Sequence, residues 1–299
     1  MSEGNSLINF GDLSKPATVL IDKVSNAIGT LYEPTKIKRV AKAEVEATKI
    51  RALGEIEATE IQQRAMERLI YEEGRKQENI ESITAQATNS LNNDASPENV
   101  EDDWISHFFE KCRNVSDSEM QGLWSSLLAG EANKPGSYSK RTVDLISTLD
   151  RPDAHLFTKL CSFSISGGDV FPLILDHKAE IYTKNGINFS ALNHLESIGL
   201  IKFNFLQNFQ LQNLPKNVTL ISFGIPINFV MPKESNNNLE IGNVVLTQAG
   251  QQLAPICGAQ LNPEFLNYML EHYKKKGIEA GVQLPNNPRQ GTPKSGSPV

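Results

Sequence analysis

Histidine and cysteine, the residue types that most often ligate metals or act as nucleophiles, are few and widely spaced in this sequence. They occur at His107, His155, His177, His194, His272, Cys112, Cys161 and Cys257. None of them has metal-ligand spacing with another, and His107 and Cys112, five residues apart on one expected helix, have poor geometry for a shared ligand. We therefore expect structural or surface roles and no bound metal.

Other patterns that accompany catalysis are also missing. The sequence has no phosphate-binding loop, no dinucleotide-binding glycine turn and no nucleophile elbow. Asp102 and Asp103 are adjacent, and adjacent residues on a helix point in different directions. A dipole role in a first helical turn is therefore favoured over acid–base chemistry. The sequence predicts a protein that is not an enzyme and that binds no cofactor.

Four cations stand close together after Pro34. They are Lys36, Lys38, Arg39 and Lys42. Cations in the first turns of a helix oppose its dipole, so a partner that favours them is one explanation. Together with the amphipathic segment before them, they could contact anionic lipid or an acidic protein. The alternative is a solvated helix start.

Composition narrows the class of protein. The chain has 299 residues, 39% hydrophobic and 21% charged, with a formal net charge of −6. This charge argues against nucleic-acid binding over the whole surface, although a local basic patch could still bind phosphates. The odd number of distant cysteines indicates reduced thiols and a cytoplasmic location. No secretory signal and no membrane span is expected.

The segment between residues 34 and 90 has the pattern of one long charged helix. Between Lys36 and Glu78 it contains ten Lys or Arg and nine Glu. We expect ion pairs between Glu60 and Arg64 and between Glu72 and Lys76. A stripe of small apolar residues runs along it at Val40, Ala43, Ala47, Ile50, Gly54, Ala58, Ile61, Ala65 and Leu69. Such a stripe buries little area by itself, so we expect it to pack against a neighbour, most simply in a homo-oligomer.

The remaining segments differ in the secondary structure that their residue patterns predict. Residues 97–165 contain four helical patterns with apolar faces, which predict a helical domain. Residues 168–278 predict a winged-helix-like domain, because a helix, strands and the segment Leu246-Thr247-x-x-Gly250-x-x-Leu253 follow in that order. A strand is expected from Leu220 to Met231. The expected recognition helix carries Asn193, His194 and Glu196 but no Lys or Arg, so protein docking is favoured over DNA binding.

Together these segments predict a mainly α protein with a small α+β part. Its order is an N-terminal amphipathic segment (1–33), the long charged helix (34–90), the helical domain (97–165), the winged-helix-like domain (168–278) and a disordered Pro/Gly/Ser-rich tail (279–299).

One motif lies in the helical domain. It includes Trp124, Glu131, Ser139 and Arg141 in the pattern Leu-Trp-x-x-Leu-Leu-Ala-Gly-Glu followed by Pro-Gly-Ser-x-Ser-x-Arg-Thr. From the residues alone, Trp124 belongs to the core, Ser139 caps a helix, and Glu131 and Arg141 could form a salt bridge across the loop. The motif resembles a bacterial family known only as a domain of unknown function, DUF2806. The N-terminal part is also similar in composition to abortive-infection proteins of phage defence.

These observations favour a non-enzymatic bacterial interaction or scaffold protein. It would self-associate through its long helix and bind a protein partner, with a role in phage defence or stress response. Two alternatives stay open, a winged-helix regulator that binds DNA and a membrane-active effector that uses residues 16–42.

Overall fold

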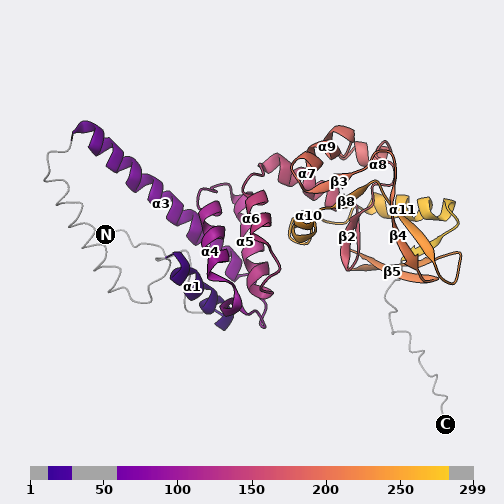
Figure 1. The fold of residues 1–299 in the computed structure, drawn as a ribbon, viewed down its shortest axis with the longest axis horizontal. Helices are drawn as coiled ribbons and strands as arrows, with labels where there is room; N and C mark the ends of the chain where they lie inside the picture. The colour runs from indigo at the N-terminus through magenta and orange to yellow at the C-terminus, as the bar shows by residue number, and fades with distance from the viewer. Residues whose placement is uncertain (1–12, 29–58, 283–299) are drawn as a thin grey trace, which may run out of the picture. The chain divides into compact units, whose positions relative to one another are not determined.

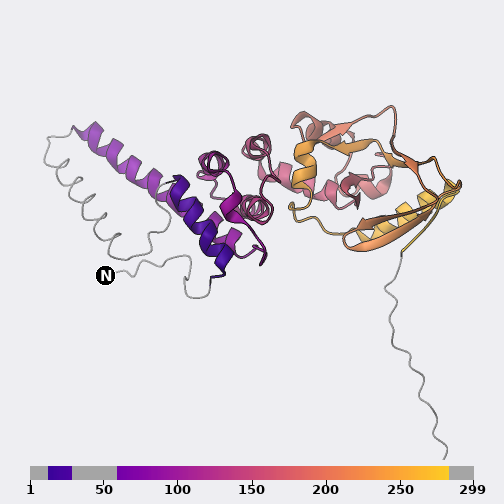
Figure 2. The same cartoon turned by 60° about the horizontal axis from the view of Figure 1, so that its bottom comes forward.

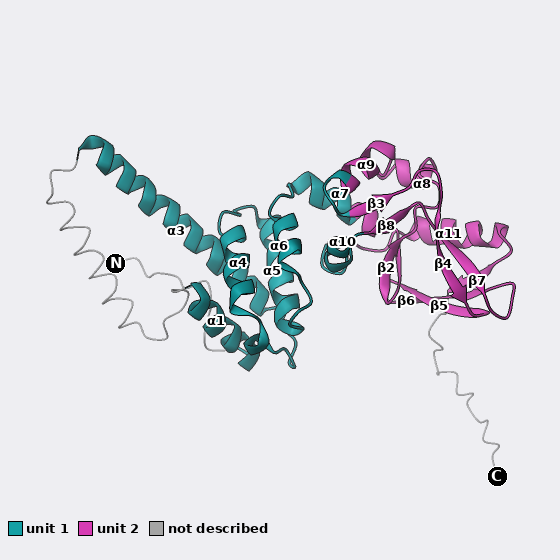
Figure 3. Ribbon diagram, viewed as in Figure 1, with its two compact units in different colours: residues 1–158, 197–200, 247–258 teal, residues 159–196, 201–246, 259–299 magenta. Residues whose placement is uncertain are grey.

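A computed structural model of the chain describes residues 13–28 and 59–282. The chain divides into two compact units (Figure 3). The first contains residues 1–158, 197–200 and 247–258, and the second contains residues 159–196, 201–246 and 259–299. Helices and strands are both present, so the predicted mixture of α and β structure is confirmed.

The first unit is helical (Figure 1). Its elements are α1 (Lys15–Ile28), α3 (Glu60–Thr88), η1 (Pro97–Asn99), α4 (Asp102–Cys112), α5 (Ser118–Asn133), α6 (Lys140–Ile146), most of α7 (Arg151–Cys161) and α10 (Gln248–Leu253). The four helical patterns predicted between residues 97 and 165 correspond to α4–α7. Two of them start with the expected capping chemistry, since Asp117 accepts backbone N–H groups at the start of α5 and Ser139 does so at the start of α6.

Aromatic side chains form the centre of this unit. Trp104 and Phe108 stack with ring centroids 5.2 Å apart, and Phe108 meets Trp124 nearly edge to face, also at 5.2 Å. All three are buried. Burying such rings provides a large part of the apolar area that holds a small helical unit together. The core therefore lies between α4 and α5.

Helix α1 completes this core with its apolar face. The side chains of Ala17, Leu20, Ile21 and Val24 are buried, and α1 packs against α4 and η1. Lys23 is tied to the same neighbours, since its Nζ lies 2.7 Å from the Asp102 carboxylate. The amphipathic helix predicted near the N-terminus thus packs within its own chain.

The second unit contains the strands. These are β1 (Ser164–Gly167), β2 (Asp169–Pro172), β3 (Ile201–Phe203), β4 (Phe209–Leu214), β5 (Asn217–Ser222), β6 (Ile225–Val230), β7 (Asn237–Gly242), β8 (Val244–Leu246) and β9 (Glu279–Val282). Five of them form an antiparallel sheet in the order β2-β1-β5-β6-β9, and β3 pairs with β8 and β4 with β7. The helices of this unit are α8 (Glu180–Thr183), α9 (Phe189–Ser197), whose last residue belongs to the first unit, and α11 (Pro263–Lys275).

Two expectations about the second unit were wrong. The single strand expected from Leu220 to Met231 is the β5–β6 hairpin, because the chain reverses at Phe223 and Gly224, which both have positive φ. Residues 279–282, predicted as the start of the disordered tail, instead form β9, which pairs with β6 from Ile227 to Val230. That pairing satisfies backbone groups of β6 that would otherwise lie at an open edge. The rest of the predicted tail lies outside the described residues.

Within the described part of the chain, no helix has both the length and the apolar character needed to cross a lipid bilayer.

Candidate functional site

The N-terminal half of α3 is the most conspicuous exposed surface of the first unit. In both Figure 1 and Figure 2 this half extends past α4 and α5. Large apolar side chains on it are open to solvent, with Ile61 71% and Leu69 52% exposed. Soluble proteins usually cover such side chains when several lie on one element. This half of α3 is therefore a candidate interaction surface.

The C-terminal half of the same helix is held firmly. Ile80, Ile83 and Ala87 are buried, and α3 packs against α5. A buried amide pair adds specificity to this contact, since the Gln121 amide nitrogen donates to the Asn79 side-chain oxygen at 3.2 Å. The boundary between the two halves of α3 thus lies just before Asn79.

The exposed and the buried residues lie on one face of the helix. Ile61, Ala65 and Leu69 follow each other at four-residue steps. Steps of three and four residues, through Glu72 and Lys76, lead on to Ile80, Ile83 and Ala87. At 3.6 residues per turn such steps keep side chains on one stripe. We call Ile61, Ala65 and Leu69 the α3 stripe.

The ion pairs along this half agree with the prediction only in part. Arg64 lies 3.5 Å from Glu60, as expected. Lys76 instead pairs with Glu73 at 2.6 Å, and Glu72 lies 3.7 Å from Arg68. These pairs are largely exposed, so each contributes only a few tenths of a kcal/mol. The four cations Lys36, Lys38, Arg39 and Lys42, and the stripe positions before Ile61, lie outside the described residues.

The sequence motif in the helical domain forms a closed loop between α5 and α6. Ser139 caps α6 by accepting the Thr142 backbone N–H at 3.3 Å. Trp124 is fully buried on α5, and its indole N–H has no hydrogen-bond partner among residues 13–28 and 59–282. The core and capping roles expected for Trp124 and Ser139 are those seen in the structure.

Glu131 has a different role from the one expected. Its carboxylate accepts the backbone N–H groups of Gly136 at 2.6 Å and of Tyr138 at 2.8 Å. Among the described residues it forms no ion pair with Arg141, whose side chain is exposed. Burial raises the pKa of Glu131 above its ordinary value, although the backbone N–H groups of Gly136, Tyr138 and Ser137 act to lower it. The loop is therefore closed by a buried carboxyl group and main-chain donors rather than by a salt bridge.

A glutamine that sequence reasoning missed completes the loop. Gln252 on α10 donates to the Ser137 carbonyl at 2.6 Å, and its side-chain oxygen accepts from the Ser139 N–H at 3.3 Å and from the Thr142 hydroxyl. Gln252 lies more than a hundred residues after the motif, so no local pattern could have assigned it. The motif residues and Gln252 together form a structural support.

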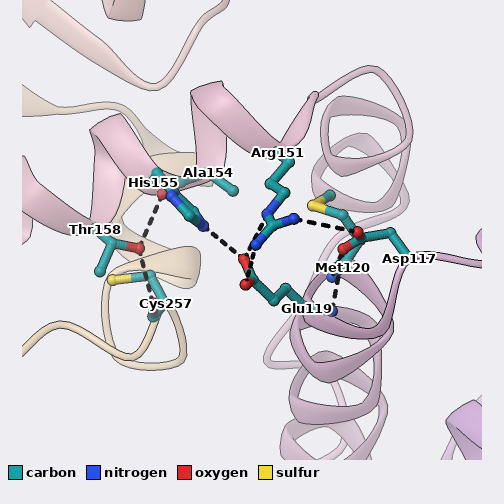
Figure 4. A network of polar contacts seen from close by, with 8 residues as sticks. All are labelled: Asp117, Glu119, Met120, Arg151, Ala154, His155, Thr158 and Cys257. Carbon is teal, nitrogen blue, oxygen red and sulfur yellow. Dashed lines mark hydrogen bonds and ion pairs between the residues drawn. The ribbon is translucent and has the colours of Figure 1, made fainter.

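A polar cluster at the start of α5 and α7 was also missed (Figure 4). Arg151 contacts the Glu119 carboxylate with two nitrogens, Nε at 2.8 Å and Nη2, and His155 Nε2 lies 2.6 Å from the same carboxylate. Hydrogen bonds from His155 and Arg151 lower the pKa of Glu119. All three side chains are about half exposed, which suits a surface ion pair rather than a desolvated catalytic group.

The described residues also bear on metal binding and thiol chemistry. Three or more His, Cys, Asp or Glu side chains do not gather in a metal-binding arrangement anywhere within residues 13–28 and 59–282. Cys112 and Cys161 are buried free thiols, and burial raises the pKa of Cys112 far above its ordinary value. A protonated, enclosed thiol is a poor nucleophile.

Comparison with known proteins gives one match. A family model described as a protein of unknown function, DUF2806, matches residues 63–270. The match includes most of α3 and the loop braced by Glu131 and Gln252. No curated protein and no solved structure matches the chain.

Proposed function

This chain belongs to the DUF2806 family, and we propose that it is a non-enzymatic interaction protein that self-associates through the α3 stripe. The observation that carries the proposal is that one face of α3 is buried in its second half, where α3 packs against α5, α1 and α4, and is open to solvent in its first half. A second copy of the helix would cover Ile61, Ala65 and Leu69 in the way that neighbouring helices of the same chain cover Ile80 and Ile83.

Size and chemistry support a helix as the partner. The open part of α3 between Glu60 and Glu78 is about 28 Å long at 1.5 Å per residue. Ala65 on the stripe permits close approach of another helix backbone, and Ile61 and Leu69 provide apolar area on either side. Arg64 and Arg68 flank the stripe on one side, as charged side chains do beside the apolar seam of paired helices.

Light scattering coupled to size-exclusion chromatography tests this proposal on the full chain. We expect an oligomer for the native protein and a monomer for the double variant Ile61→Glu, Leu69→Glu. The matched control is Ile70→Glu, which introduces the same charge at a neighbouring exposed position that lies about 100° away from Leu69 around the helix. This control should stay oligomeric. A native protein that is monomeric at tens of micromolar, or a double variant with unchanged mass, would contradict the proposal.

The biological role that we propose is phage defence or stress response, from the likeness of the N-terminal part to abortive-infection proteins. Phage plating on bacteria that express the native chain or the double variant tests it. Protection that depends on an intact stripe is the expected result, and equal plating with and without the protein would contradict it.

A DNA-binding regulator is the second candidate. The observation that favours it is the antiparallel pair of β3 and β8, which follows α9 and precedes α10 in the chain as in a winged helix. The absence of Lys and Arg from α9 makes this candidate the weaker one. A salt-dependent gel shift on duplex DNA tests it, and no shift at low salt would exclude it.

The membrane-active effector has less support. Its apolar surface would come from α1, whose apolar side chains are already buried against α4 and η1. Flotation with anionic vesicles separates this alternative from the others, because only a membrane-binding chain would float.

A further inference from the structure

The second unit contains an open cavity with aromatic walls that the self-association proposal does not involve. Its volume is about 460 Å³, and its lining residues are His177, Lys178, Thr183, Asn188, Phe189 and Phe205. Cavities between about 300 and 1,000 Å³ with aromatic walls and a few polar groups are typical of small-ligand sites.

Two phenylalanines make this cavity unusual for a surface depression. Phe189 is 49% exposed and Phe205 is 59% exposed. Their ring centroids are 6.1 Å apart and their planes meet at 78°. A flat ring that stacks on one phenylalanine would therefore meet the other edge to face, and both of these arrangements are favourable between aromatic groups. The walls thus suit a planar aromatic ligand.

Buried side chains beneath the cavity pack against two of its lining residues, Phe189 and His177. The buried Phe203 contacts both Phe189 and His177, with centroids 5.7 Å from each. The buried Asn243 places its amide nitrogen 3.0 Å from His177 Nδ1. Side chains that are already packed in this way lose less freedom when a ligand binds.

Two polar side chains at the same cavity, Lys178 and Asn188, can bind a ligand. Lys178 forms no ion pair within the described part of the chain. The Asn188 side-chain oxygen accepts the Ala191 N–H at 3.0 Å, while its amide nitrogen has no protein partner among the described residues. A cation and an amide donor beside aromatic rings fit a ligand that has a flat ring with acceptors and a negative group.

We propose that this cavity binds a nucleobase that carries a phosphate, with the base against Phe189 and Phe205 and the phosphate at Lys178. Base stacking on aromatic side chains is insensitive to sequence, because every base has a π face. The same chemistry is offered by a free mononucleotide and by a single strand of DNA or RNA.

Isothermal titration calorimetry on the full chain at low salt tests the proposal with AMP, adenosine and a thymidine octanucleotide. Phe205→Ala should weaken AMP binding by about tenfold or more. Leu206→Ala is the matched control, because Leu206 is the exposed neighbour of Phe205 and does not line the cavity. It should leave binding unchanged. Lys178→Gln should reduce the affinity for AMP to that for adenosine.

The octanucleotide distinguishes the two sources of the ligand. Binding about tenfold tighter than AMP, with the same loss in Phe205→Ala, identifies a single strand, whereas equal affinity identifies a free nucleotide. Circular dichroism should show that each variant is folded. Absence of heat for all three ligands at millimolar concentration, or binding that Phe205→Ala leaves unchanged, would overturn the proposal. None of these outcomes depends on the oligomeric state, so this test and that of the α3 stripe can fail separately.

Discussion

The two halves of α3 have the same pattern of side chains and different surroundings. Apolar residues in both halves lie on one face of the helix, with Glu72 and Lys76 between them, yet Ile83 is fully buried while Ile61 is 71% exposed. The difference arises because neighbouring helices pack on the C-terminal half, where Gln121 of α5 contacts both Asn79 and Ser82. An amphipathic pattern therefore shows which face of a helix seeks a partner, and the tertiary structure shows whether the chain supplies that partner itself.

The largest expected effect comes from truncating one side chain in each half of α3 and comparing the free energies of unfolding. Ile83→Ala should lower the free energy of unfolding by about 2–5 kcal/mol, because it leaves a cavity in a packed core. Leu69→Ala should change it by no more than about 0.5 kcal/mol in the monomer, since the side chain lies in solvent. Urea denaturation at low protein concentration measures both. Similar losses for the two variants would mean that the halves are not in different surroundings.

A smaller change in the free energy of unfolding is expected for the loop between α5 and α6 that Glu131 closes. Glu131→Gln replaces an acceptor with an amide donor that faces a backbone N–H, which should cost about 1–3 kcal/mol. Because burial raises the pKa of Glu131, the native protein should exceed the Glu131→Gln variant in free energy of unfolding by the full amount below the ordinary carboxyl pKa. This difference should decline as the pH rises through the raised pKa. Urea midpoints across this range, with the exposed Glu110→Gln as control, measure it. An advantage that grows with pH would contradict this account.

The cap of α6 should have a more modest effect. Ser139→Ala removes the acceptor of the Thr142 N–H and should destabilise the first unit by about 1 kcal/mol. Ser139→Asn keeps a capping oxygen and should restore most of that loss. If alanine and asparagine behave alike in thermal unfolding, the hydroxyl contributes through its other contacts and not through the cap.

The smallest effect is expected at the exposed polar cluster. The pKa of Glu119 is lowered by its hydrogen bonds to His155 and Arg151. The contribution of the Glu119 carboxylate to the free energy of unfolding should therefore be present above the ordinary carboxyl pKa. It should be lost as the pH falls through the lowered pKa. Glu119→Gln should shift the urea midpoint slightly at neutral pH and low salt, and high salt should abolish the difference. A shift that survives high salt would show that the cluster does more than pair surface charges.

Much of the helical unit could be predicted from sequence because its signals are local. Ser139 and Asp117 precede apolar patterns of helical period, so both caps and the helices after them follow from neighbouring residues. The β5–β6 hairpin could not be predicted in this way. Its turn has positive φ at Phe223, where asparagine or aspartate before glycine is the usual signal.

The roles of single residues at the candidate sites were harder to predict than the elements that hold them. Glu131 binds backbone N–H groups that any sequence would provide, so its partner could not be read from side-chain types. The cavity of the second unit unites His177, Phe189 and Phe205, which come from different elements of that unit. No spacing in the sequence relates these residues to one another.

The sequence by itself determined the four helices α4–α7, which of their faces are apolar, and that this chain resembles the DUF2806 family. Those properties depend on periodicity, capping and local motifs. Only the tertiary structure decided which part of the α3 face is covered, how Glu131 and Gln252 close the motif loop, and which aromatic rings meet in a cavity. These features are contacts between residues far apart in the chain, and their energies depend on burial and geometry that no local pattern records.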